Sequence, residues 1–337
     1  MFDKLCLFAH FDRDDLVADY VLHYLQAIRN AGFPIVVIST SKLSAEDVAR
    51  LKSVAHDVIL RENRGHDFAS WGLGLERYAD QVTGQLLIAN DSVYAPIGDF
   101  GDALARLTSV EADAYGMIES LEIARHLQSW FLLLEKRVHA HPDFRAVFAQ
   151  DFSALVKTDI IRNGEIGLSQ TLLSHGFRLH ALFSGLSRTG RAMHMSSNYS
   201  HFLWRELIEN EGIPFLKIEL LRVNPCRIAD LAEWPEIVGR HAPELVPMIQ
   251  DHLERTVTGQ GKSIEAIQRI SVTRNDMQSF IRRDYAYAST RRPIAGLGNL
   301  LLLNGVRMKR LLMHVVYRSL APIRHKLGPL RRKFPPQ

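Results

Sequence analysis

Cysteine is scarce in this sequence: its two cysteines, Cys6 and Cys226, lie in apolar surroundings without CxxC spacing. This scarcity argues against a disulfide framework and a cysteine-based metal site, and it is typical of a reducing compartment. The first twelve residues also lack a basic start, a long apolar stretch and an AxA-like cleavage site. We therefore expect no signal peptide and a cytoplasmic protein.

Common signatures of cofactor binding and nucleophilic catalysis are missing as well. The sequence has no GxGxxG and no GxxxxGKS/T, so neither a dinucleotide fold of the usual kind nor a P-loop is indicated. Its 15 histidines show no HxxxH spacing on a convincing helix, and no Ser-His-Asp or Cys-His arrangement is legible.

Acidic residues are absent from the last part of the chain. Residues 285–337 contain eleven Lys or Arg and no Asp or Glu, whereas residues 1–284 carry 30 basic and 37 acidic side chains, a balance of −7. A mildly acidic body therefore precedes a basic tail, and the composition changes near residues 259–262. We predict one main domain over residues 1–258 and a helical, basic segment over residues 259–337.

The first half alternates between short apolar strands and amphipathic helices. Strand and helix recur every 25 to 30 residues, which is typical of an α/β fold with a mostly parallel, Rossmann-like sheet flanked by helices. Strands are predicted at residues 4–9, 34–40, 57–62, 85–90 and 114–119, and helices at residues 14–32, 44–55 and 68–81.

The pattern loosens in the second half. Residues 126–138 are interpreted as a strand or helix lining the site, and residues 165–177 as a helix that ends at Gly176. A helix, a turn and an extended apolar segment are expected over residues 198–225, and two further helices over residues 226–256.

Polar residues follow the predicted strands where each strand ends. In a parallel sheet these ends share one edge, and ligands bind beyond it. The groups in question are His10 and Asp12, Ser39 and Ser41, residues 61–67, and residues 90–92. We predict that they line one cleft.

Two of these groups suit a diphosphate. Gly65 lets the backbone approach a ligand closely, and the helix that follows offers free N–H groups at its N-terminus. Asp91 ends a buried strand, where a carboxylate can hold a divalent cation that bridges the diphosphate. The alternatives are a solvated helix cap at Gly65 and an Asx turn at residues 90–92.

Six motifs occur along the chain in this order: "HFDRDD", "RENRGHDFASWGLGLE", "NDSVYAPI", "HLQSWF", "EIGLSQTLLSHGF" and "PFLKIELLRVNP". Together they resemble the rhamnan synthesis protein F family over roughly residues 5–255. The family is similar to GT-A glycosyltransferases that assemble polysaccharides and the lipopolysaccharide O-antigen, often by transferring rhamnose. GT-A enzymes usually carry Asp-x-Asp after the fourth strand, whereas here Asp91 is the one acidic residue, between Asn90 and Ser92. The resemblance implies a nucleotide-sugar donor and a Mg²⁺ or Mn²⁺ ion at Asp91.

The resemblance also implies roles for particular residues. Glu165, expected near a helix N-terminus, corresponds to the base that deprotonates the acceptor hydroxyl; the alternative is a favourable charge on the helix dipole. His126, Gln128, Trp130 and Lys217 are candidates for contacts with a sugar or acceptor; the alternatives are a core strand and, for Lys217, solvated surface charge. The expected nucleotide-sugar contacts are His10, Asp12, Ser39, Asn63, Arg64, Gly65, Asp67, Asn90 and Ser92.

The resemblance implies an inverting glycosyltransferase that uses dTDP-L-rhamnose and a polysaccharide or lipid-linked acceptor. The alternative is a non-catalytic, membrane-associated assembly protein with a degenerate GT-A fold. In the tail, the apolar run from Leu300 to Leu303 is far short of the ~20 residues that span a bilayer. With its clustered cations it favours a helix lying on an anionic membrane, on the inner face of the cytoplasmic membrane; the alternative is a C-terminal helix packed on a partner subunit. Nucleic acid is not an expected partner, because the basic tail is rich in leucine and lacks RNA-binding signatures.

Overall fold

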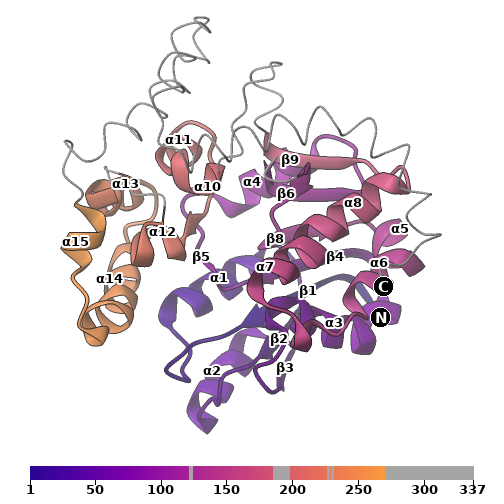
Figure 1. Cartoon of the computed structure of the whole chain (residues 1–337), viewed down its shortest axis with the longest axis horizontal. Helices are drawn as coiled ribbons and strands as arrows, with labels where there is room; N and C mark the ends of the chain where they lie inside the picture. The colour runs from indigo at the N-terminus through magenta and orange to yellow at the C-terminus, as the bar shows by residue number, and fades with distance from the viewer. Residues whose placement is uncertain (121–123, 185–197, 226–227, 229–230, 270–337) are drawn as a thin grey trace, which may run out of the picture.

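The computed structural model describes residues 1–120, 124–184, 198–225, 228 and 231–269 (Figure 1). Its centre is an eight-stranded sheet in the order β3-β2-β1-β4-β8-β6-β7, with β9 paired to β6. The strands are β1 (Phe2–His10), β2 (Ile35–Ser39), β3 (Asp57–Leu60), β4 (Val82–Asn90), β6 (Ala114–Ser120), β7 (His126–Leu127), β8 (Phe131–Leu134) and β9 (Leu179–Ser184).

Most strands of the sheet run in one direction. β1 pairs in parallel with β2 and β4, β2 with β3, and β6 with β9. β8 runs antiparallel between β4 and β6, and β7 runs antiparallel to β6. The predicted mostly parallel α/β sheet flanked by helices is therefore confirmed.

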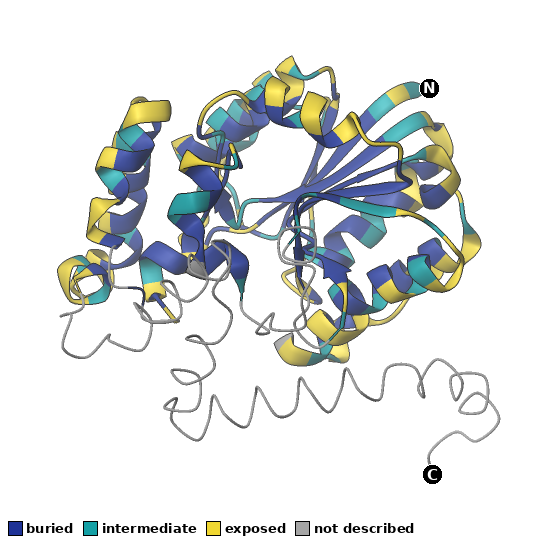
Figure 2. Ribbon diagram, turned by 90° about the horizontal axis from the view of Figure 1, so that it is seen from above, coloured by how far each residue is buried: buried dark blue, intermediate teal, exposed yellow. Residues whose placement is uncertain are grey.

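Helices cover both faces of the sheet, because successive strand residues point to opposite sides. In β1, Cys6 and Phe8 belong to a core with α1 (Asp19–Asn30) and α4 (Phe100–Thr108), whereas Leu5 and Leu7 belong to a core with α3 (His66–Tyr78). Figure 2 shows the buried strands between helices whose exposed sides face outward. The second face is completed by α6 (Pro142–Phe148) and α8 (Gly167–Ser174).

The first core continues into a group of helices at one side of the sheet, at the left of Figure 1. Two of them, α13 (Trp234–His241) and α14 (Leu245–Thr256), are the helices expected over residues 226–256. The others are α10 (Tyr199–Phe202), α11 (Trp204–Glu209), α12 (Ile218–Val223) and α15 (Ile264–Gln268).

Several local expectations are confirmed. The Ser44 hydroxyl caps α2 (Ala45–Val54) by accepting the Asp47 N–H at 3.0 Å. Gly176 follows α8 with a φ of +76°, the left-handed conformation expected of a residue that ends a helix.

Other expectations were wrong in detail. Residues 126–138 form neither one strand nor one helix; they divide into β7, β8 and the short α5 (Lys136–His139). The segment expected to be extended contains β10 (Leu216–Lys217) and then turns into α12, which buries Leu220 and Leu221 against the core. β10 pairs with β5 (Val93–Tyr94), a short strand that was not expected.

The described residues include no helix that is both long and apolar enough to cross a membrane. The predicted membrane-binding tail lies almost wholly in residues 270–337, outside the described residues.

Candidate functional site

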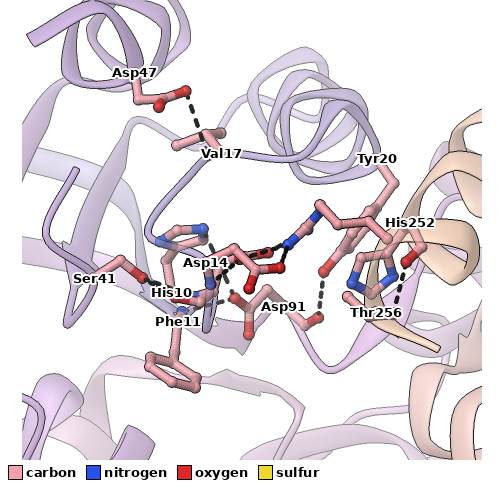
Figure 3. A network of polar contacts seen from close by, with 12 residues as sticks. His10, Phe11, Asp14, Val17, Tyr20, Ser41, Asp47, Asp91, His252 and Thr256 are labelled. Atoms are coloured by element: carbon pink, nitrogen blue, oxygen red, sulfur yellow. Dashed lines mark hydrogen bonds and ion pairs between the residues drawn. The ribbon is translucent and has the colours of Figure 1, made fainter. Parts of the chain in front are cut away.

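Asp91 lies directly after β4, beside the end of β1 (Figure 3). Its Oδ2 accepts a hydrogen bond from the Phe11 N–H at 2.7 Å and lies 4.0 Å from His10 Nε2. Burial, and then the nearby negative charge of Asp67, raise the pKa of Asp91 well above its ordinary value. A carboxylate in such surroundings is favoured either as its neutral acid or with a cation beside it.

His10, at the end of β1, does not supply that positive charge. Its Nδ1 lies 2.9 Å from Ser39 Oγ, at the end of the neighbouring strand β2. Burial lowers the pKa of His10 to about 4, so the imidazole is neutral at pH 7. Its Nε2 is buried and has no hydrogen-bond partner among the described residues.

Asp67 and Asp91 are brought together through Asn90. The Asn90 side-chain amide donates a hydrogen bond to Asp67 Oδ2 at 2.7 Å, and its Oδ1 accepts from the Ser92 N–H and hydroxyl. Lys217, on β10, in turn donates to Ser92 Oγ at 3.1 Å. These bonds order residues 90–92 after β4. This segment forms the Asx turn named as the alternative, and it also carries the candidate ligand-binding carboxylate of Asp91.

Asp12 is already saturated by protein donors. Its carboxylate receives two hydrogen bonds from Arg255 of α14, at 2.9 and 2.6 Å, and one from the Asp14 N–H at 2.8 Å. Burial alone would raise the pKa of Asp12, but these hydrogen bonds outweigh it and lower that pKa. Asp12 therefore lies at the predicted edge of the sheet, but with its oxygens engaged.

The loop before α3 divides into exposed and packed residues. Asn63 and Arg64 are exposed, and Arg64 pairs with Glu62 at 3.3 Å. Gly65 is buried with a φ of +73°, and a Cβ there would lie 2.7 Å from the Ala69 Cβ and 3.0 Å from that of Phe152. Internal packing thus requires this glycine, whether or not a ligand approaches it.

Glu165 was expected near a helix N-terminus, and this expectation was wrong. It lies in a π-helical turn (η3, Ile161–Ile166) within a continuous helical segment, between α7 (Lys157–Ile160) and α8. The extra residue per turn was not apparent from the apolar spacing. Such turns often occur at functional sites.

The Glu165 carboxylate is held by several donors. Its Oε2 accepts from the Ser129 N–H at 2.6 Å and from the Ser129 hydroxyl at 2.7 Å, and its Oε1 lies 3.5 Å from His126 Nε2. Burial would raise the pKa of Glu165, but His126 and Ser129 together lower it. Glu165 is therefore ionised at neutral pH but is a weaker base than an unpaired glutamate.

Trp130 belongs to the core. The residue is 3% exposed, its ring contacts Phe215, and its Nε1–H donates to Gln128 Oε1 at 2.9 Å. Lys217 Nζ lies 5.3 Å from the centre of this ring. Trp130 is therefore a core residue, as the alternative held, but it lies in the turn before β8 rather than in a strand.

Within the described part of the chain, one group of three side chains could hold a metal ion by itself, and it lies elsewhere. It consists of His141, Asp143 and His175, on the segments that leave β8 and enter β9. Asp143 Oδ2 pairs with His175 Nε2 at 2.6 Å, and His141 Nδ1 accepts the Asp143 N–H as a helix cap. A cation at Asp91 would therefore need further oxygen ligands from its substrate or from water.

Sequence reasoning missed the residues that connect α14 to the site. His252 Nδ1 lies 2.7 Å from the Tyr94 hydroxyl, and Tyr20, whose ring contacts both, donates to the Asp91 carbonyl at 3.4 Å. Figure 3 shows Tyr20 and His252 beside Asp91. No local pattern marks these residues, because their partners lie far away in the sequence.

Residues 35–279 match the family described as rhamnan synthesis protein F, which is more than two thirds of the sequence. The chain belongs to the rhamnan synthesis protein F family. It is 27% identical over 166 residues to the uncharacterized protein y4gN of Sinorhizobium fredii, an alignment that covers 48% of this chain and 43% of that one. The chain thus spans less than half the length of that relative. It is 25% identical over 272 residues to the virulence protein VirA of Vibrio anguillarum, covering 70% of this chain and 84% of that one.

Two solved structures align with parts of the chain. A cytidylyltransferase from Leptospira borgpetersenii has 8% identity and a TM-score of 0.36, over 71% of this chain and 97% of that one. Core-mannan synthase A from Aspergillus fumigatus, in a Mn/GDP form, has 7% identity and a TM-score of 0.33, over 51% and 70%. Likenesses this weak bear on neither activity nor ligand.

Proposed function

We propose that this protein is a glycosyltransferase that moves a sugar from a nucleotide-sugar donor to a glycan or lipid-linked acceptor. Membership of the family supports the reaction class. The observation that carries the proposal is the position of Asp91, a carboxylate with a raised pKa and 12% of its side chain exposed, near Asp67 at the carboxyl edge of a parallel sheet. This is the edge where such sheets bind their ligands.

The charges around Asp91 support a divalent cation as part of the bound donor. Arg255 is held between Asp12 and Asp14, so its charge is already balanced. A diphosphate beside Asp91 and Asp67 would therefore meet an excess of negative charge. Carboxylate oxygens are the ligands that Mg²⁺ and Mn²⁺ prefer. Such an ion, held by Asp91 and approached by Asp67, would supply positive charge to the departing diphosphate.

We further propose that the donor is dTDP-L-rhamnose, that the sugar is transferred with inversion, and that Glu165 receives the proton of the acceptor hydroxyl. The family's description, rhamnan synthesis, favours an activated rhamnose. Glu165 has 20% of its side chain exposed and is ionised at neutral pH, so it is able to accept a proton.

A non-catalytic assembly protein is the second candidate. The observations that favour it are the single carboxylate of "NDS", where GT-A enzymes usually have two, and the three donors around Glu165. Such a protein would have no need to turn over a donor.

A screen of nucleotide sugars with and without Mn²⁺ separates the two candidates. Thermal shift reports binding to the native state, and release of nucleoside diphosphate reports turnover. We expect both for the wild-type protein with at least one deoxysugar donor, and neither for Asp91→Ala. Binding without turnover, in the presence of membranes carrying acceptor glycans, would favour the assembly protein.

A further inference from the structure

We propose that α14 helps to position the Asp91 carboxylate, and that Arg255 on this helix is a positioning residue. Arg255 holds Asp12, and Asp12 in turn fixes the loop that orients Asp91. The loop is residues 11–15, between β1 and α1. The inference rests on the proposed function, and it adds to that function a helix that is distant in sequence from the rest of the site.

The contact between Arg255 and Asp12 has the geometry of a strong ion pair. Both terminal nitrogens of the guanidinium reach the carboxylate, one to each oxygen, at 2.9 and 2.6 Å. Such bidentate pairs fix orientation as well as distance. Asp12 is 7% exposed, so loss of Arg255 would leave a buried carboxylate without its countercharge.

Asp12 transmits this constraint to the loop. Its backbone N–H and C=O both bond the Ser41 hydroxyl, at 2.7 and 2.9 Å, and its carboxylate accepts the Asp14 N–H. The preceding residue, Phe11, donates its N–H to Asp91 Oδ2. One peptide unit therefore separates the group that Arg255 holds from the group that orients Asp91.

A second connection runs from the same helix to the other side of Asp91. His252 lies one turn before Arg255 on α14 and bonds the Tyr94 hydroxyl of β5, three residues after Asp91. Tyr20 packs against both rings, with centroid distances of 4.8 Å to His252 and 5.1 Å to Tyr94. Its hydroxyl reaches the Asp91 carbonyl (Figure 3). Through Asp12 and Tyr94, α14 therefore contacts both segments that place this carboxylate.

The same contacts would exist if the ion pair only stabilised the fold, so the test needs a matched arginine elsewhere. Arg106 of α4 is similarly well bonded: it donates to Asp102 at 2.8 Å and to the carbonyls of Glu211 and Gly212 at 3.0 and 2.8 Å. None of these partners belongs to the site. Arg106→Met therefore removes a comparable set of bonds without touching residues 11–15.

The experiment compares Arg255→Met, Arg255→Lys, Asp12→Asn, Asp12→Asn/Arg255→Met and Arg106→Met in the full chain. It measures kcat and KM for the donor, the Tm, and hydrogen exchange of the amides in residues 11–15. We expect kcat/KM to fall about 10²-fold in Arg255→Met, the loss typical of a misplacement of about 1 Å. Arg255→Lys should recover about tenfold of this loss, because it restores the charge without the bidentate fork.

Two further results are required. The double variant should lose no more activity than Arg255→Met, since both changes break one pathway. Arg106→Met should keep kcat/KM within twofold of wild type, and it should lower the Tm less than Arg255→Met does, because its partner Asp102 is exposed whereas Asp12 is buried. Activity of Arg255→Met within threefold of wild type, or an equal loss in Arg106→Met, would overturn the inference.

Failure of the proposed function gives a different result. In that case the wild-type protein itself turns over no nucleotide sugar, and hydrogen exchange still tests the connection. Faster exchange at residues 11–15 in Arg255→Met than in Arg106→Met supports the positioning role, and equal exchange contradicts it.

Discussion

The Phe11 amide donates a hydrogen bond to the Asp91 carboxylate over 2.7 Å, and so joins the loop after β1 to the residue that follows β4. The bond fixes the direction of Asp91 without neutralising it, because an amide carries no net charge. Burial, and then the negative charge of Asp67, raise the pKa of Asp91 well above its ordinary value, although the bond from Phe11 lowers it in part. Within the described residues, the ion-pair contact of Asp91 is with His10, which is neutral at pH 7, so a bound cation would supply the charge that this carboxylate lacks.

Asp91→Asn should make the cation-free protein at least as stable as the wild type. The folded state disfavours the ionised carboxylate, and asparagine removes that penalty while its oxygen can still accept the Phe11 N–H. Gains of this kind at functional residues usually come with a loss of activity. Thermal denaturation in EDTA at pH 7.5 measures the effect, and a clear decrease in Tm would show that the Asp91 charge is stabilised by something else.

The same comparison should depend on pH with a defined sign. Because the pKa of Asp91 is raised on folding, the folded protein retains this proton above pH 3.8 while the unfolded chain loses it. Wild-type stability should thus fall relative to Asp91→Asn as the pH rises from about 4 through the folded pKa, and then level off. If the stability difference between the wild type and Asp91→Asn shrinks as the pH rises, the pKa of Asp91 is not raised on folding.

Glu165→Gln should slow transfer by about 10²-fold, the lower end of the range for a lost general base, because its donors already weaken it. Donor affinity should change little, since Glu165 bonds Ser129 and His126 rather than residues around Asp91. Single-turnover rates and the donor Kd separate the two quantities. If kcat stays within threefold of wild type while the Tm falls, the residue only supports the turn at Ser129.

The basic tail should hold the protein on anionic membranes. Each Lys or Arg near such a surface contributes on the order of 1 kcal/mol, and residues 285–337 carry eleven of them with no acidic residue. Flotation with vesicles containing phosphatidylserine should recover the full chain at low salt and not a version ending at Asp284. Equal flotation of both would remove the proposed anchor, and with it the proposed location on the inner face of the cytoplasmic membrane.

Local chemistry predicted much of the fold and part of the site. The alternation of strands and helices up to Ser120 follows from apolar periodicity, and parallel pairing then brings His10, Ser39 and Asn90 to one edge. The division of residues 126–138 and the π-helical turn at Glu165 depend on tertiary packing, which overrides periodicity. The contact of Arg255 with Asp12 spans 243 residues, and no local pattern encodes a partner at that distance.

The most direct test of the central claim is nucleoside diphosphate release from a panel of nucleotide sugars, with Mn²⁺ and with EDTA, by the wild-type protein and Asp91→Asn. The account predicts release by the wild type that depends on the cation, strongest with dTDP-L-rhamnose, and a loss of about 10²-fold or more in Asp91→Asn. Release in EDTA as fast as with Mn²⁺, by both the wild type and Asp91→Asn, would contradict a cation-dependent donor site at Asp91.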